Sequence, residues 1–421
     1  MSNMKEVSNL KDKSMDLAIF GGSPAFSRQI HVGRPNIGDR EKLLSRIKDI
    51  LDSGWLTNHG PMVTEFEKRL ADHLGVKNCI TVTNGTIALE IAIKALDLKG
   101  EIIVPSFTFV ATAHAIQWQE ITPVFVDIDP HTFNLQPDYI EEMITPKTSG
   151  IIGVHTWGRP CNTDGIEEIA KNRNLKVIYD AAHAFSVSRN GKKIGNFGDA
   201  EVFSFHATKF MNTFEGGAIA TNNDELAEKI KLMTNFGFAG HDNVIYIGTN
   251  GKMSEVCAAM GLTSLESIDE FIQTNKENYT TYRDELKDVK GISFIEYDEK
   301  ESPNYQYIII EVDQNEIKLS RDELVSILHA ENVLARRYFY PGCHKMEPYR
   351  SYYPHAGYLL PITESKSERV MSLPTGTSTN KDEIIKICEI IKSVIADGES
   401  ISKRLDEVPE KLAFKMPVVG R

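Results

Sequence analysis

The stretch of sequence that decides the fold runs over residues 177–220 and reads VIYDAAHAFSVSRNGKKIGNFGDAEVFSFHATKFMNTFEGGAIA. It contains three short apolar runs with the length and composition of strands buried on both faces, Val177–Tyr179, Val202–Phe205 and Ala218–Ala220. Polar side chains follow the first two runs, with Asp180 directly after one and Lys209 four residues after the other. The stretch therefore predicts buried strands with chemically useful groups at their ends.

The same texture continues toward the N-terminus. Four more strand candidates precede this stretch, Cys79–Val82, Ile102–Val104, Pro123–Val126 and Ile151–Val154. Apolar residues at helical spacing lie between and around the strands, as at Val63, Phe66, Leu70 and Leu74. Strand–helix alternation of this kind predicts an α/β domain over residues 16–272, with a mostly parallel, seven-stranded sheet flanked by helices.

The pattern changes after about residue 272. A helical stretch at Tyr279–Leu286 leads to strands near 292–295 and 307–312, and helices follow at 321–330 and 381–395. These elements predict a smaller α+β domain over residues 273–400. We expect residues 1–15 and 401–421 to form terminal tails.

Composition excludes several classes of function. The chain of 421 residues has 59 acidic and 47 basic side chains, a net charge of −12 that disfavours nucleic-acid binding but allows one small anionic ligand. The five cysteines are scattered without a C-x-x-C pair, which argues against a disulfide framework or a structural zinc. Because no secretory signal and no membrane-spanning run is recognisable, we expect a cytoplasmic protein.

Four features lie just past predicted strands, where ligands of parallel sheets gather. The turn at Gly85 and Thr86 opens a helix, whose free amides favour an anion, although a plain capped turn would look the same. Asp180 could face a protonated ring nitrogen or simply cap a helix. Lys209 lies among aromatic residues that would lower its basicity, whereas most lysines are solvated. Phe109 could stack on a planar cofactor or pack in the core.

The order and spacing of these features resemble the DegT-type sugar aminotransferases, which are fold-type I pyridoxal-phosphate (PLP) enzymes. The motif S-F-H-A-x-K of that family matches residues 204–209, and its D-A-A-H matches residues 180–183. The resemblance extends from about residue 20 to residue 395. It implies that Lys209 binds PLP and acts as the base, and that Asp180 faces the pyridine nitrogen.

Other cofactor contacts follow from the same resemblance. Gly85, Thr86 and Ser204 match the groups that hold the phosphate, and Phe109 matches the aromatic residue that stacks on the ring. His183 matches a residue near the ring hydroxyl. Asn250 matches an asparagine that reaches the phosphate in the neighbouring subunit, which implies a homodimer with shared active sites.

Several stretches look like the 4-aminotransferases of dTDP-4-keto-6-deoxyglucose within that family, among them residues 20–26, 155–161 and 338–350. The resemblance implies transfer from glutamate to C4 of that sugar through pyridoxamine phosphate, giving 2-oxoglutarate and dTDP-4-amino-4,6-dideoxyglucose. The aromatic and basic residues Tyr338, Tyr340 and His344 suit a nucleotide sugar, although a packed Pro-Gly loop is the alternative. Thr57 and Lys252 are further candidates, and Lys252 stands where many relatives have arginine.

The sequence is also compatible with other functions. Another keto nucleotide sugar, aminated at C3 or linked to UDP, would use the same cofactor chemistry. Family members that remove a sugar hydroxyl have histidine in place of the lysine, so Lys209 favours amino transfer. A PLP-binding protein without turnover, with a regulatory role, is the alternative from a different class.

Overall fold

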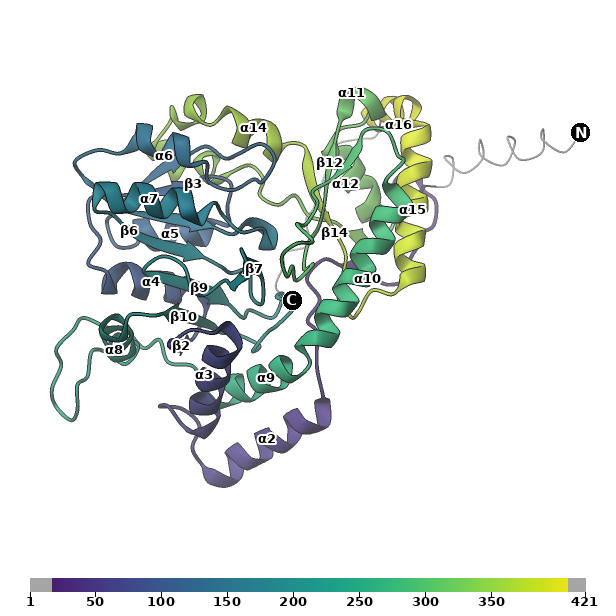
Figure 1. Cartoon of the computed structure of the whole chain (residues 1–421). Coiled ribbons are helices and arrows are strands. Elements are labelled where there is room, and N and C mark those ends of the chain that lie inside the picture. The colour runs from purple at the N-terminus through teal and green to yellow at the C-terminus, as the bar shows by residue number, and fades with distance from the viewer. Residues whose placement is uncertain (1–16, 408–421) are drawn as a thin grey trace, which may run out of the picture.

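The computed structural model describes residues 17–407 and contains a larger lobe beside a smaller one, each built on its own sheet (Figure 1). The predicted N-terminal tail, residues 1–15, lies outside the described residues. Among residues 17–407, no helix is long and apolar enough to cross a membrane.

The larger lobe contains a seven-stranded sheet, which confirms the predicted fold class. In spatial order its strands are β2 (Asn78–Val82), β10 (Gly217–Thr221), β9 (Ala200–Ser204), β6 (Lys176–Asp180), β5 (Thr148–Val154), β3 (Glu101–Pro105) and β4 (Thr122–Val126). Only β10 runs antiparallel to its neighbours. The remaining strands therefore end at the same edge of the sheet.

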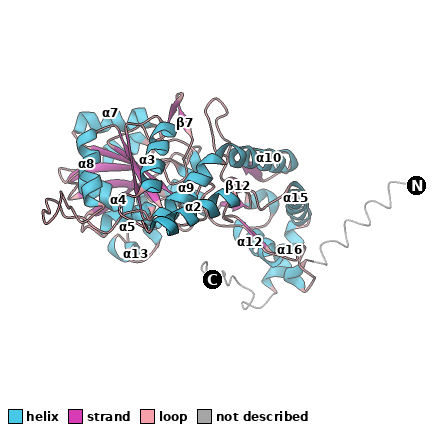
Figure 2. Ribbon diagram, turned by 90° about the horizontal axis from the view of Figure 1, so that it is seen from below, coloured by secondary structure: helices cyan, strands magenta, loops and turns pink. Residues whose placement is uncertain are grey.

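Helices cover both faces of this sheet (Figure 2). One face packs on α4 (Gly85–Ala95), α5 (Val110–Gln117) and α8 (Asp224–Met233). The other packs on α3 (Pro61–Leu74), α6 (Pro137–Met143), α7 (Thr163–Arg173) and α9 (Glu255–Glu266). Neighbouring strand residues alternate between the two cores, as Val202 and Phe203 do. Burial on both faces explains why these strands are apolar throughout.

The smaller lobe contains a three-stranded antiparallel sheet of β11 (Ile292–Phe294), β12 (Ile308–Val312) and β14 (Val370–Leu373). Its core is completed by α10 (Ile268–Leu286), α12 (Arg321–Ala330) and α15 (Lys381–Ala396). The remaining α-helices of the described chain are α2 (Arg40–Ser53), α11 (Gln314–Ile317), α13 (Tyr349–Tyr352), α14 (Pro361–Ser367) and α16 (Gly398–Asp406). The short strands are β1 (Ile30–His31), β7 (Ser188–Arg189), β8 (Lys192–Lys193) and β13 (Val333–Leu334).

The path of the chain differs from the predicted linear division in three places. Strand β1 pairs with β13, and Leu17 and Phe26 lie in the core of the smaller lobe. Conversely, Cys343 and Tyr349 pack in the core of the larger lobe. Helix α16 continues to residue 406, beyond the predicted start of the C-terminal tail at residue 401. Each lobe is thus assembled from distant parts of the chain.

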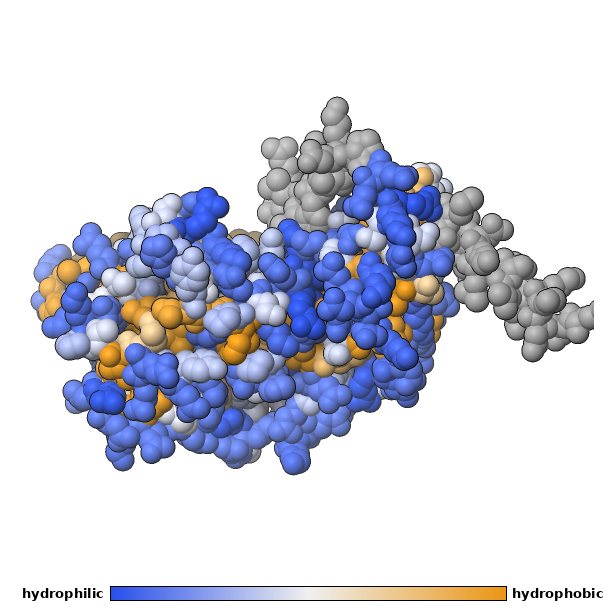
Figure 3. Space-filling model, turned by 90° about the horizontal axis from the view of Figure 1, so that it is seen from above, coloured by the Kyte–Doolittle hydropathy of each residue, from blue (hydrophilic) through white to orange (hydrophobic). Residues whose placement is uncertain are grey.

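The face of the molecule seen from above in Figure 3 is mostly hydrophilic, and apolar side chains form a band across it between hydrophilic margins. The net charge of −12 is consistent with this appearance.

Candidate active site

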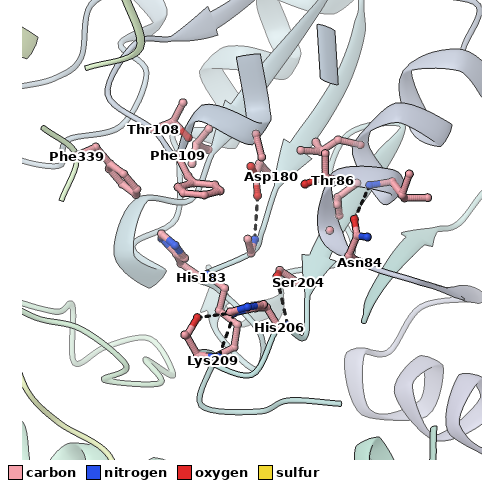
Figure 4. Close-up of a pocket in the computed structure, with 18 of the residues that line it drawn as sticks. Asn84, Thr86, Thr108, Phe109, Asp180, His183, Ser204, His206, Lys209 and Phe339 are labelled. Atoms are coloured by element: carbon pink, nitrogen blue, oxygen red, sulfur yellow. Dashed lines mark hydrogen bonds between the residues drawn. The ribbon is translucent and has the colours of Figure 1, made fainter. Parts of the chain in front are cut away.

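A cavity of about 680 Å³ lies where β2, β3, β6 and β9 end. Its lining includes Gly85, Thr86, Phe109, Asp180, His183, Ser204, Lys209, Tyr338 and Phe339. Figure 4 shows most of them around one space. The tertiary structure therefore brings together residues that are up to 254 positions apart (339 − 85).

Lys209 lies in the turn that follows β9. Its backbone N–H donates to the His206 carbonyl at 2.8 Å, and its Nζ donates to Tyr307 Oη at 3.4 Å. Burial lowers the pKa of the Lys209 amine to about 8, an effect that the negative charge of Asp180 opposes and the positive charge of Arg336 reinforces. A substantial fraction of this amine is therefore unprotonated near neutral pH.

Asp180 is the last residue of β6, and its carboxylate is buried. One oxygen accepts from Thr112 Oγ1 at 2.9 Å, and the other accepts from the Ala182 N–H at 3.1 Å. Burial raises the pKa of Asp180, whereas these two hydrogen bonds and the charge of Lys209 lower it. The hydrogen bonds fix the direction in which the carboxylate points.

The predicted anion site lies at the start of α4. Asn84 caps this helix by accepting from the Ile87 N–H at 2.9 Å, and the first amides of the helix line the cavity at Gly85 and Thr86. A Cβ atom at Gly85 would lie 3.0 Å from Cβ of Ser204. Glycine is therefore what allows the helix terminus to approach the Ser204 hydroxyl so closely.

Aromatic groups complete the cavity. Phe109 is 55% exposed although it lines a cavity, so it is available to stack on a planar ligand instead of packing in the core. His183 Nδ1 accepts from the Trp157 N–H at 3.2 Å, and burial and then the charge of Lys209 hold the pKa of His183 well below its usual range. The ring of His183 lies parallel to Phe339 at 5.7 Å. His183 is thus a neutral, fixed side chain.

These groups fit PLP. A helix terminus with a nearby serine suits its phosphate, and an oriented carboxylate suits its ring nitrogen. An exposed phenyl ring suits its flat face, and a buried amine of lowered pKa suits its aldehyde. The predicted cofactor residues, apart from Asn250, therefore lie around one cavity.

Five predicted residues do not line this cavity: Thr57, Asn250, Lys252, Tyr340 and His344. Lys252 Nζ contacts the Asn235 and Asn250 side-chain oxygens at 2.8 and 2.9 Å. Tyr340 lines a smaller neighbouring cavity. The two nitrogens of buried His344 contact Ser106 Oγ at 2.7 Å and Glu364 Oε1 at 3.2 Å. Since both are engaged, the position of His344 does not support the predicted contact with substrate.

Sequence reasoning missed four residues of the site: Thr112, Tyr307, Arg336 and Phe339. Thr112 had a detectable signal, because a second threonine, Thr108, precedes it by four residues shortly after the predicted strand at 102–104. In the structure their hydroxyl oxygens lie 3.0 Å apart. Arg336 and Phe339 flank Tyr338, which was predicted. Tyr307 carried no local signal.

Known proteins are similar to this chain over most of its length. Residues 38–392 match the DegT/DnrJ/EryC1/StrS aminotransferase family. The dTDP-4-amino-4,6-dideoxy-D-glucose transaminase of Shigella dysenteriae is 42% identical, over 88% of this chain and 100% of that protein. The GDP-perosamine synthase of Escherichia coli O157:H7 is 35% identical, over 88% and 100%. The crystal structure of DesI in the presence of its TDP-sugar product is 45% identical with a TM-score of 0.90, over 93% and 99%. The chain therefore belongs to the DegT/DnrJ/EryC1/StrS aminotransferase family.

Proposed function

We propose that this PLP-dependent aminotransferase moves the amino group of glutamate to C4 of dTDP-4-keto-6-deoxyglucose, giving dTDP-4-amino-4,6-dideoxyglucose and 2-oxoglutarate. The observation that carries the chemistry is the buried amine of Lys209 in one cavity with Asp180 and the turn at Gly85. Support for the sugar comes from the relatives at 42% and 45% identity, one named for this amino sugar and the other crystallised with its TDP-sugar product.

Lys209 supplies the base. Bound PLP provides an electron sink that acidifies the hydrogen on the donor's α-carbon. With a pKa of about 8, the Lys209 amine is unprotonated in about a tenth of molecules at pH 7, so it can both bond to an aldehyde and accept a proton. Tyr307 Oη accepts a hydrogen bond from Nζ at 3.4 Å and so directs the amine when it is not bonded.

Asp180 supplies the negative charge that keeps a ring nitrogen protonated. The Thr112 hydroxyl and the Ala182 amide stabilise the carboxylate against the cost of its burial. The amides at Gly85 and Thr86, together with the Ser204 hydroxyl, would hold the phosphate. The exposed ring of Phe109 would stack on the flat face of the cofactor.

We also propose a cytoplasmic homodimer in which Thr57, Asn250 and Lys252 of each copy serve the cavity of the other. These residues do not line the cavity of their own chain. Nearby, the described chain exposes Phe236, Phe238, Val244, Ile245 and Ile247, which are apolar side chains that a second copy would cover. Tyr338 and Tyr340 are the proposed contacts for the nucleotide sugar within one chain.

A second candidate is amination of another keto nucleotide sugar. The relative at 35% identity is named for a GDP-linked product, so the nucleotide varies among proteins of this similarity. A PLP-binding protein without turnover is the third possibility, which the buried amine of lowered pKa disfavours.

The test is a substrate panel. The purified enzyme is incubated with glutamate and with keto sugars linked to dTDP, UDP or GDP, and each product is identified by mass spectrometry and NMR. We expect a 4-amino product from the dTDP sugar and none with a Lys209→Ala variant. A 3-amino product, or amination of the UDP sugar alone, contradicts the assignment. Failure of glutamate to change the cofactor's absorbance would instead favour a protein without turnover.

A further inference from the structure

Arg336 is a cation of the active-site cavity that the proposed mechanism does not use. It lines the 680 Å³ cavity with Lys209, and it also lines the smaller cavity of about 160 Å³ that contains Tyr340. Arg336 therefore lies at the boundary between the two spaces. Its side chain is partly buried.

No acidic side chain among the described residues forms an ion pair with Arg336. In contrast, Arg337 pairs with Asp322 at 2.8 Å, and Arg369 pairs with Glu311 at 3.2 Å. The acidic residues of the cavity are engaged elsewhere, since Asp180 accepts two hydrogen bonds and Glu215 lies 3.4 Å from His206. The guanidinium is partly buried and contacts the Tyr338 side chain but no carboxylate, so a ligand's carboxylate would supply the charge-assisted hydrogen bonds that it lacks.

The guanidinium is also held in place. The backbone of Arg336 exchanges two hydrogen bonds with Ser372 on β14, at 3.0 and 2.8 Å, and its Cζ lies 4.7 Å above the Tyr338 ring. The Tyr338 ring lies 6.0 Å from that of Tyr307, whose hydroxyl contacts Lys209. The rings of Tyr338 and Tyr307 therefore lie between the guanidinium and the Lys209 amine. The charge of Arg336 is near enough to lower the pKa of Lys209.

Both proposed substrates carry anions, and their chemistry distinguishes them. The amino nitrogen of glutamate must reach the carbon that Lys209 binds, and its two carboxylates follow within two and four bonds of that nitrogen. In the nucleotide sugar the diphosphate is attached at C1, across the hexose ring from C4. A planar, fixed guanidinium near Lys209 matches a carboxylate, which it can bind through two parallel hydrogen bonds.

We propose that Arg336 binds a carboxylate of the amino donor. This rests on the proposed function, because it assigns the donor's anchor within the same site. Arg336 then acts in the half-reaction with glutamate, and the diphosphate of the sugar is bound by other groups.

The first test measures binding without turnover. Glutarate, a dicarboxylate that has no amine to react, is titrated into the PLP-loaded enzyme by calorimetry. We expect Arg336→Gln to weaken glutarate binding at least about 10-fold, the effect of losing one charge-assisted hydrogen bond. Arg336→Lys keeps the positive charge but lacks the two parallel N–H donors of the guanidinium, so its affinity for glutarate should lie between those of the wild type and Arg336→Gln. The matched control Arg369→Gln removes a paired arginine of the same lobe and should leave the affinity unchanged.

The second test separates the two anions. Stopped-flow absorbance follows the half-reaction of each variant with glutamate and, separately, with the dTDP amino sugar. We expect Arg336→Gln to slow the first at least about 10-fold at subsaturating glutamate, and to change the second less than about 3-fold. A loss confined to the amino sugar would mean that Arg336 binds the diphosphate, and unchanged kinetics with glutamate would equally overturn the proposal. If the wild type does not react with glutamate, the proposed function itself fails.

Glutamine and isoglutamine show which carboxylate is bound. Each lacks one of the two negative charges of glutamate, at the side chain and at the α-position respectively. Relative to glutamate, the wild type should lose most reactivity with the analogue that lacks the carboxylate bound by Arg336. With that same analogue, Arg336→Gln should react almost as fast as the wild type, because the contact is already absent. Equal further losses with both analogues would show that Arg336 contacts neither carboxylate.

Discussion

The lowered pKa of Lys209 predicts how the apoenzyme takes up its cofactor as pH changes. Only an unprotonated amine bonds to the aldehyde of PLP. With a pKa of about 8, roughly 9% of Lys209 amines are unprotonated at pH 7. A solvated lysine, with a pKa near 10.5, has about 0.03% unprotonated at the same pH. Lys209 should therefore present about 300 times more reactive amine than an exposed lysine.

The assay mixes apoenzyme with PLP between pH 6 and pH 10 and follows the absorbance of the lysine-bound cofactor. PLP also ionises over this pH range, so the reaction of PLP with free N-acetyl-lysine serves as the reference. At each pH the rate with N-acetyl-lysine is divided by the unprotonated fraction of that amine, and the rate with apoenzyme is divided by the result. We expect the corrected rate to rise about 10-fold per pH unit and to level off near pH 8. Lys209→Ala should give no such absorbance.

Two variants test the causes of the shift. The negative charge of Asp180 raises the pKa of Lys209, so Asp180→Asn should move the midpoint below pH 8. The positive charge of Arg336 lowers that pKa, so Arg336→Gln should move the midpoint upward. If the corrected rate of PLP uptake by the wild type still rises from pH 9 to pH 10, the pKa of the amine is not lowered by burial. If the pH midpoint of Asp180→Asn moves upward, the electrostatic reasoning is wrong.

Three further predictions concern stability and the cofactor site. Because the unfolded chain holds the Lys209 proton more tightly than the folded chain between pH 8 and pH 10.5, this residue makes stability rise with pH across that window. Lys209→Met removes this cost, so it should raise the thermal midpoint of the apoprotein at pH 7. The increase should become smaller as the pH rises, and a lower midpoint at pH 7 would contradict the reasoning. Gly85→Ala places a Cβ 3.0 Å from Ser204 and should weaken PLP binding about 10-fold in equilibrium dialysis, and an unchanged affinity would exclude the close approach. Thr112→Val removes the 2.9 Å hydrogen bond to Asp180 and should lower turnover about 10-fold in steady-state assays, whereas full activity would show that Ala182 alone orients the carboxylate.

Local pattern was sufficient to predict the elements that form the site. Each strand of the larger sheet is buried on both faces, so each appears in the sequence as a short apolar run, and the helix over 321–330 begins and ends where predicted. The predicted strands at 292–295 and 307–312 differ from β11 and β12 by one residue at one end each. Asp180 ends β6 and Lys209 follows β9, and it was the order and spacing of such residues along the chain, rather than any one local signal, that predicted the site.

Contacts between distant segments carried no local signal. The pairing of β1 with β13 joins residues 30–31 to residues 333–334, and nothing in either dipeptide indicates the other. The engagement of His344 with Ser106 and Glu364 likewise depends on how residues 343–360 return to the larger lobe. For this reason a histidine that looked available for substrate in the sequence is buried in the structure.

By itself the sequence determined the α/β class and the seven strands, because each depends on residues close together in the chain, and its resemblance to a family predicted Lys209, Asp180 and the turn at Gly85 as site residues. Only the tertiary structure decided that these groups surround one cavity, that Thr112 orients Asp180, and that Arg336 lines the cavity of Lys209 without an acidic partner among residues 17–407. The physical reason is that burial and electrostatic interaction depend on distance in space. The 127 positions that separate Lys209 from Arg336 (336 − 209) leave that distance open until the chain is folded.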